Sequence, residues 1–285
     1  TSFGYELSHH LNDDWTFRQN ARFTHYTGYE NQLFRNSAVI ANTIINRYYQ
    51  LRDYENDNVA LDNQLLGTFD TGPLSHTLLS GVDYQHSKRS NLIQTGNAPA
   101  INIYAPDHSV VIDTSSYTSL MNTRDKSRQL GLYLQDQIRL GNWVASLGGR
   151  YDWASQDTDS RTYSVASGLT TGGLQTVDAD DFTGRVGLGY LFDSGVFPYI
   201  SYTESFVPVS GTDRSGSAFQ PETARQYEVG VKYQPTGYDS YVTLAAFDLR
   251  RQNVLTTDVS APSFSVQEGE VTSRGIELEG VLKPL

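Results

Sequence analysis

The sequence predicts an all-β fold: a transmembrane antiparallel up-and-down β-barrel, of which this chain supplies about eleven strands. Three observations carry the prediction. Apolar and polar residues alternate with period two over long segments. Short and long connections alternate along the chain. The chain contains no run of about 18 apolar residues, so no membrane helix is predicted. A barrel strand exposes only alternate residues to lipid, so the mean hydropathy of −0.45 is compatible with a membrane barrel.

The stretch WVASLGGRYDW at 143–153 shows the alternation clearly. One series of alternate residues is mostly apolar and begins and ends with Trp143 and Trp153, whereas the other contains Arg150 and Asp152. A tilted barrel strand crosses the hydrocarbon in about 9–11 residues, so the two tryptophans suit the two interfaces. Burial of this face in a β-sandwich or propeller core is the alternative. With lipid on this face and a solvated lumen opposite, we expect Trp143→Arg to destabilise more than Arg150→Ala.

Eleven segments carry the strand pattern, and many are longer than the usual strand of about 5–6 residues. In chain order they are 2–10, 15–26, 52–70, 75–93, 126–140, 143–160, 180–193, 196–209, 223–236, 240–257 and 264–284.

The connections predict which edges of the sheet face which side of the membrane. Residues 11–14, 71–75, 141–142, 194–195 and 235–239 are short and contain the Gly, Asn, Asp and Pro typical of tight hairpins. The long polar connections 27–51, 94–125, 161–179, 210–222 and 258–263 alternate with them. Outer-membrane barrels have short periplasmic turns and long extracellular loops, so we expect the long loops to be extracellular.

Several function classes are disfavoured by composition and motifs. A formal charge of −11 disfavours nucleic acid as a partner. The chain has no cysteine, its six histidines form no HxxxH or HxH pair, and the acidic runs at 12–14, 55–63 and 178–181 lack EF-hand spacing, so we expect no metal site. No GxSxG or GxxxxGK[ST] motif is present, so we expect neither catalysis nor a nucleotide as energy source.

An ordered set of segments resembles one family closely. DDWTFRQNARF (13–23), GGRYDW (148–153), SYTESFVP (201–208), QYEVGVKY (226–233) and SRGIELEG (273–280) occur in the order found in the barrel of TonB-dependent ferric siderophore receptors. Within this family the segments are most similar to those of the ferrichrome (ferric hydroxamate) receptors. The resemblance covers nearly all predicted strands and skips the long loops.

The resemblance implies a 22-stranded barrel of the bacterial outer membrane, plugged by a separate N-terminal domain. Residues 1–285 are then the middle part of the barrel, about half of its strands, with no plug domain in this chain. The implied function is active uptake of a hydroxamate-type ferric siderophore, energised by the TonB–ExbB–ExbD system through the plug. Iron would travel inside the siderophore, and the protein itself would hold no cofactor. Outer-membrane lipid and lipopolysaccharide, and a phage or bacteriocin, are the other implied partners.

The resemblance also points to ligand-contacting residues. Counting from TFRQNARF, Phe34 falls where the family has an aromatic ligand contact, and Asn36 falls where it has a second aromatic. Tyr26, Tyr29 and Tyr104 are further aromatic candidates in the upper strand or the loops. On the polar faces lie eight charged residues for which contact with the plug and plain solvation both remain open: Arg150, Asp152, Arg185, Glu204, Glu228, Lys232, Glu277 and Glu279.

Three other functions remain alternatives at this point. A passive porin-type channel would share the alternation and the loop asymmetry. A soluble β-rich sugar-binding or hydrolytic domain would bury the apolar faces in protein. A surface-adhesion or phage-docking role of the loops is compatible with siderophore uptake.

Overall fold

The computed structural model describes residues 1–36, 43–209, 211–217, 219–235, 237–261 and 264–283. Within these residues the chain forms one antiparallel sheet of eleven strands in sequence order and a small two-stranded hairpin, β11–β12. None of the residues described forms a helix long and apolar enough to cross a membrane. The strands of the large sheet are β1 Ser2–His10, β2 Trp15–Arg35, β3 Ile44–Thr71, β4 Leu74–Asn102, β5 Ser119–Leu140, β6 Trp143–Ser164, β7 Leu169–Tyr190, β8 Val196–Val207, β9 Glu222–Tyr233, β10 Tyr241–Gln252 and β13 Glu270–Val281. The hairpin is β11 Thr256–Thr257 with β12 Ser265–Val266.

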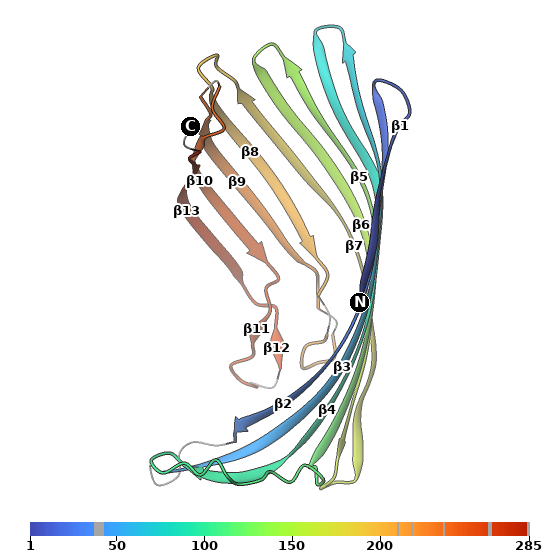
Figure 1. Cartoon of the computed structure of the whole chain (residues 1–285), viewed down its shortest axis with the longest axis vertical. Helices are drawn as coiled ribbons and strands as arrows, with labels where there is room; N and C mark the ends of the chain where they lie inside the picture. Colours follow the sequence, from blue (N-terminus) through green and yellow to red (C-terminus); the bar gives the residue numbers. More distant parts are fainter. Residues whose placement is uncertain (37–42, 210, 218, 236, 262–263, 284–285) are drawn as a thin grey trace.

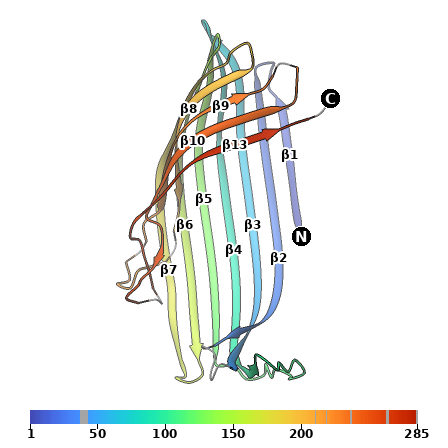
Figure 2. The ribbon, with the colours of Figure 1, turned by 90° about the vertical axis from the view of Figure 1, so that its left-hand side faces the viewer.

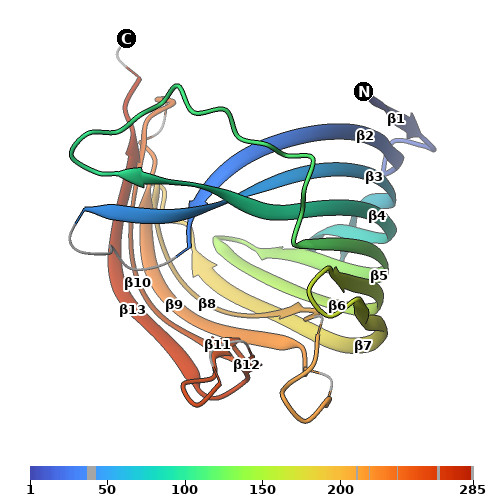
Figure 3. The same cartoon turned by 90° about the horizontal axis from the view of Figure 1, so that it is seen from below.

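The sheet curls around an open interior, with β1 and β13 as its two edges (Figure 3). Figures 1 and 2 show the long strands tilted together, with tight turns at one end and larger connections at the other. Gly72 and Gly141 hold two of the tight turns with positive φ values of 64° and 56°, which favour glycine. The predicted up-and-down sheet is therefore confirmed, and this chain forms part of a barrel wall.

Several strands run further than the sequence pattern predicts. β2 continues to Arg35 and β3 begins at Ile44, so strand occupies much of the predicted loop 27–51. Likewise, β4 and β5 extend into 94–125, and β6 and β7 leave only 165–168 of 161–179 between them. Beyond the lipid both faces of a hairpin meet water, so the alternation disappears although the backbone ladder continues. Residues 37–42, 210, 218 and 262–263 of the predicted loops, and residues 236 and 284 of the predicted strands, lie outside the described residues.

At the other end of the chain two predicted strands are too long. β10 ends at Gln252 and β13 begins at Glu270, whereas the predicted strands were 240–257 and 264–284. Residues Thr256–Thr257 pair with Ser265–Val266 instead, because the β10–β13 connection folds into its own small hairpin. β8 likewise ends at Val207, two residues before the predicted end at residue 209.

The apolar faces are not covered by protein. Leu134, Trp143 and Leu147 on the convex face are about half exposed, at 54%, 50% and 47%. Among the described residues only Tyr49, Ile93, Phe219 and Ala245 are buried and hydrophobic, too few for a sandwich core. A continuous apolar outer band with almost no core fits a wall surrounded by lipid and contradicts the soluble β-rich domain.

Asp136 interrupts the apolar series of β5, and the structure explains why it is tolerated. His76 lies on the same face of β4 and its Nδ1 is 2.7 Å from Asp136 Oδ2. The other ring nitrogen of His76 is 2.7 Å from the Thr71 hydroxyl, and its ring stacks on Phe69. One oxygen of this carboxylate is therefore paired near the tight-turn end of the sheet, whereas the other, Oδ1, is buried without a hydrogen-bond partner among the described residues.

Candidate functional site

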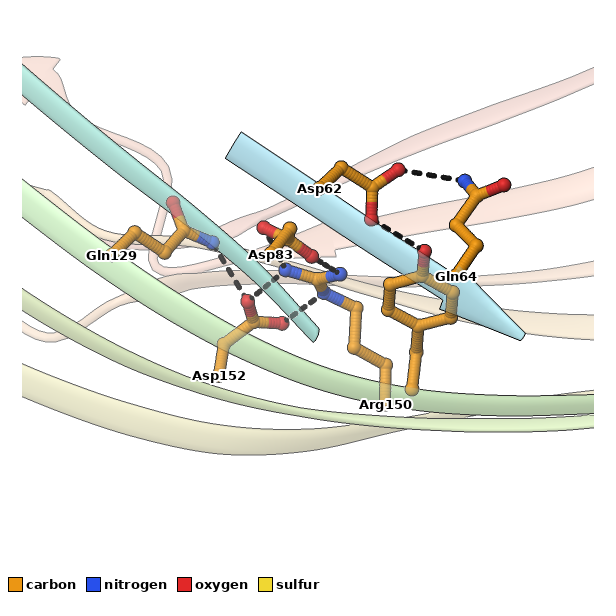
Figure 4. A network of polar contacts seen from close by, with 7 residues as sticks. Asp62, Gln64, Asp83, Gln129, Arg150 and Asp152 are labelled. Carbon is orange, nitrogen blue, oxygen red and sulfur yellow. Dashed lines mark hydrogen bonds and ion pairs between the residues drawn. The ribbon is translucent and has the colours of Figure 1, made fainter. Parts of the chain in front are cut away.

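An arginine clamped by two aspartates marks the middle of the concave face. Arg150 on β6 donates from Nε to Asp152 Oδ2 at 2.7 Å and from Nη2 to Asp83 Oδ1 on β4 at 3.1 Å. Further hydrogen bonds from Arg150 Nη1 and Nη2 make both contacts two-pronged. Gln129 Nε2 donates to Asp152 Oδ1 at 2.8 Å, and Figure 4 shows these groups converging over β5. The two carboxylates are nearly buried, so their negative charges are balanced mainly by one guanidinium.

Gly131 on β5 makes this arrangement possible. It is the cross-strand neighbour of both Asp83 and Asp152, so it lies directly between the two carboxylates. A Cβ atom at Gly131 would come within 1.9 Å of Arg150 Nη2. The guanidinium therefore occupies the space above a missing side chain, and it reaches across one whole strand to bind β4.

A second cluster continues the polar surface toward β3. Tyr133 donates its hydroxyl to Asp62 Oδ1 at 2.7 Å, and Gln64 Nε2 donates to Asp62 Oδ2 at 2.6 Å. The Arg150 guanidinium lies 5.7 Å from the centre of the Tyr133 ring. Members of both clusters line a hollow of about 600 Å³, the size of a small-ligand or side-chain pocket: Asp83 and Arg150 from the first, and Asp62, Gln64 and Tyr133 from the second.

The Arg150 cluster changes one expectation from the sequence. A solvated lumen would make Arg150→Ala nearly neutral, but this side chain is two-thirds covered and binds two carboxylates. Trp143 lies at the end of β6, where an arginine side chain can reach the interface. From these contacts we now expect the opposite ranking, with Arg150→Ala more destabilising than Trp143→Arg.

The other charged residues predicted on polar faces lie in two places, one around Tyr199 and one beside Arg150. Glu228 accepts from the Tyr199 hydroxyl at 2.6 Å, and Lys232 stands 5.4 Å from the centre of the Tyr199 ring. Tyr241 donates to Glu279 at 3.3 Å, and Glu277 lines a second hollow together with Glu228, Lys232 and Glu279. Arg185 and Glu204 line the hollow beside Arg150. Tyrosine and glutamine side chains thus hold several of these carboxylates in place.

The predicted ligand residues divide between the two faces of β2. The register pairs Asn20 with Asp62, Tyr26 with Asn56 and Phe34 with Tyr48, so Tyr26 and Phe34 share the concave face with Asp62. Tyr29 has the opposite parity, points to the convex side and is 59% exposed.

The remaining two candidates lie at the long-loop end. Asn36 continues β2, and its amide donates to the Asn46 carbonyl at 2.8 Å. Tyr104 lies in the connection after β4 and is exposed. Neither is brought close to Tyr26 or Phe34 by a contact in the part of the chain that the structure describes.

Two aromatic residues that the sequence did not single out complete the concave face of this hairpin. Tyr54 meets Tyr26 edge-on, with ring centres 6.2 Å apart, and Tyr48 stacks on Phe34 at 5.2 Å. Asn56 Nδ2 donates to the Tyr26 hydroxyl at 2.8 Å. Their place on the concave face follows from the β2–β3 register. That register could not be read from the sequence, because residues 27–51 were expected to form a loop.

His25 lies beside two carboxylates on the convex face. His25 Nδ1 is 2.7 Å from Asp57 Oδ1 and 4.0 Å from Glu55 Oε1, and all three side chains are open to solvent. The spacing could hold a metal ion, but the His25–Asp57 hydrogen bond already accounts for the contact. Sequence spacing could not show this group because its members lie on two neighbouring strands.

Loop aspartates form local turns. In Asp107, Asp113, Asp213 and Asp258 the carboxylate accepts from the serine two residues later, through both its hydroxyl and its amide in Asp107, Asp213 and Asp258 and through its amide in Asp113. Hydrogen bonding by the serine two residues later lowers the pKa of each of these aspartates. A carboxylate engaged in its own turn is a structural residue of the loop.

Comparison with known proteins places the chain among receptors. The family described as "TonB dependent receptor-like, beta-barrel" matches residues 1–283. The chain is 34% identical over 299 residues to the ferrichrome outer membrane transporter/phage receptor of Escherichia coli (strain K12), covering 97% of this chain and 39% of that protein. It is also 34% identical over 279 residues to the ferrioxamine B receptor of Salmonella typhimurium (strain SL1344), with 98% and 38% covered.

Solved structures agree on the fold. The closed form of the ferric-catecholate import receptor Fiu from E. coli K12 superposes with a TM-score of 0.82 at 20% identity, over 98% of this chain and 44% of that one. The ferripyoverdine receptor of Pseudomonas aeruginosa gives 0.78 at 20% identity, over 99% and 38%. The chain therefore spans less than half the length of the relatives it matches.

Proposed function

The chain belongs to the TonB-dependent receptor β-barrel family of the outer membrane, and from that premise we propose that the protein takes up a ferric siderophore of the hydroxamate type. The observation that carries the hydroxamate assignment is the equal identity, 34% over nearly the whole chain, to receptors named for ferrichrome and for ferrioxamine B. Both of these siderophores bind iron through hydroxamate groups. The relatives are receptors and transporters, so no catalytic residue is assigned.

The two aromatic pairs on the concave face suit such a cargo. A ferric hydroxamate complex presents aliphatic and amide surface, because its iron is already enclosed by the siderophore. Rigid aromatic side chains supply contact area at low entropic cost. Phe34 with Tyr48 and Tyr26 with Tyr54 present such area on the lumen side of the long-loop end, which we take as extracellular. Asn36, Tyr29 and Tyr104 are weaker candidates, because none of them adds to this aromatic surface.

The polar hollow around Arg150 would then face the plug domain. The energy for uptake would come from TonB–ExbB–ExbD, acting on a plug that lies outside this chain. A lumen wall that must hold and release a domain benefits from charged groups that are already paired within the wall, such as Arg150 with Asp83 and Asp152. Docking of a phage or bacteriocin on the loops is compatible with this proposal, since one relative is named a phage receptor and one solved neighbour is a complex of FpvAI with pyocin S2.

Fluorescence quenching of the full-length receptor in detergent tests the proposal, with ferrichrome, ferrioxamine B and a ferric catecholate as ligands. We expect saturable quenching by a hydroxamate. Phe34→Ala should weaken that binding by about tenfold or more, the size expected for an aromatic anchor. Leu33→Ala, next to it on the opposite face, is the matched control and should bind normally. Quenching by none of the three complexes would remove the siderophore assignment.

A further inference from the structure

One strand of the wall has a long free edge. β7 pairs with β6 along its whole length, from Leu169 with Ser164 to Tyr190 with Trp143. On its other side β7 pairs with β8 only over Arg185–Gly189. In the residues that the structure describes, no strand pairs with 169–184 on that side, and the β8–β9 connection reaches this part of β7 through one side-chain hydrogen bond, from Gln175 Nε2 to Thr212 Oγ1 at 3.2 Å. Figure 1 shows β7 continuing past the end of β8. An edge of this length is an open template for another strand.

The backbone of this edge already attracts hydrogen-bond acceptors. The Gly184 amide donates to Glu204 Oε2 at 2.9 Å, and the Phe182 amide donates to Asp181 Oδ1 at 2.8 Å. These amides point away from β6, and the strand period of two places the amides of Thr176, Asp178 and Asp180 on the same edge. Two carboxylate oxygens thus stand where the carbonyl oxygens of an added strand would lie.

The charge of the edge selects its partner. Asp178 and Asp180 share the convex face of β7, where Asp180 also accepts from the Tyr151 hydroxyl, and Asp181 lies on the concave face. Glu204 stands beside Gly184, at the end of the opening next to the β7–β8 pairing. A second copy of this chain would bring the same acids to the contact and would be repelled. An extended segment with lysine or arginine at alternate positions would place its cations opposite Asp178 and Asp180 while its backbone completes the ladder.

We propose that the free edge of β7, residues 174–182, is a docking site for an extended basic segment of another protein, which adds to the sheet as one further strand. The edge offers about 30 Å of backbone, enough for a nine-residue segment. The aspartates have two effects: they keep copies of the barrel from pairing edge to edge, and they favour a basic partner. Main-chain hydrogen bonds provide the affinity, and the acids provide the selectivity.

The test uses the full-length receptor in detergent and a labelled nine-residue peptide that alternates lysine and valine. The matched control peptide has the same sequence with N-methyl groups on the amides of one edge. We expect the methylated peptide to bind about tenfold more weakly, because it loses several backbone donors. The peptide should also slow hydrogen exchange of the amides in 174–182 and leave those of 143–153 unchanged. Equal binding of both peptides, or no binding of either, would overturn the proposal.

A second test changes the receptor edge and keeps the peptide unchanged. Thr176→Pro removes an amide that points to the open edge, so the ladder with β6 stays complete. We expect about tenfold weaker peptide binding with an unchanged barrel, judged by circular dichroism. Asp178→Asn should weaken binding and reduce its dependence on salt. Peptide binding to Thr176→Pro at the original affinity would show that the peptide adsorbs by charge alone and would refute strand addition.

Discussion

Replacement of Arg150 by methionine isolates the role of the charged cluster in the barrel wall. Methionine keeps much of the arginine stem but removes the guanidinium that binds Asp83 and Asp152. The two carboxylates have only 12% and 6% of their side-chain surface exposed, so they would remain as uncompensated charges facing each other. We therefore expect a large loss of stability from a single substitution, mainly because the two carboxylates lose their cation.

The magnitude follows from burial. Removing one partner of a fully buried ion pair costs about 3–5 kcal/mol. Arg150 is itself 30% exposed, so water screens part of the interaction, and we expect a loss of about 3 kcal/mol. The variant Arg150→Met with Asp83→Asn and Asp152→Asn removes all three charges and should lie within about 1 kcal/mol of the natural protein.

Unfolding of the full-length receptor in micelles by guanidinium chloride, monitored through tryptophan fluorescence, measures these free energies of unfolding. Arg161→Met is the matched control on the same strand, because its ion pair with Asp159 is open to solvent and should contribute about 0–1 kcal/mol. If Arg150→Met costs no more than Arg161→Met, the cluster does not stabilise the wall. If the triple variant is as unstable as the single one, the buried carboxylates are not the cause.

Two further predictions concern the outer face and the loops. Leu147→Arg places a charge in the middle of the lipid-facing series and should lower the free energy of unfolding by about 2–4 kcal/mol in the same assay. Trp143→Arg at the interface should lower it by about 0–1 kcal/mol. Equal losses for the two variants would contradict the placement of the lipid-facing band. Ser215→Ala removes the hydroxyl that most strongly lowers the pKa of Asp213, so the Asp213 pKa should rise toward its ordinary value of 3.8. Because the Asp213 pKa is depressed in the fold, the turn is stabilised above that value and loses the stabilisation as pH falls through the depressed pKa. NMR titration of the Asp213 carboxyl in the receptor and in the Ser215→Ala variant checks this, and an unchanged pKa would refute it.

Sequence pattern predicted the sheet well because alternation reports which face meets lipid. Trp143, Leu147 and Trp153 share one face in the pattern, and they share the convex face of β6 in the structure. Strand ends were not predictable in the same way. Residues 27–35 mix polar and apolar side chains on both faces, so they gave no period-two signal although β2 continues through them.

The candidate site required cross-strand register, which the sequence does not supply. Asp152 lies two residues from Arg150 and could be placed on its face from the pattern alone. Asp83 lies 67 residues away, and its contact depends on two strand pairings that meet at Gly131. Tyr48, on the concave face opposite Phe34, was missed for the same reason.

Uptake of radioactive iron as ferrichrome or ferrioxamine B by cells that carry the full-length receptor tests the central claim most directly. The measurement compares cells with and without TonB, at siderophore concentrations where simple diffusion is slow. Energised transport predicts that iron accumulates only when both the receptor and TonB are present. Uptake that is the same without TonB would show a passive channel, and no receptor-dependent uptake of either complex would contradict the proposed function.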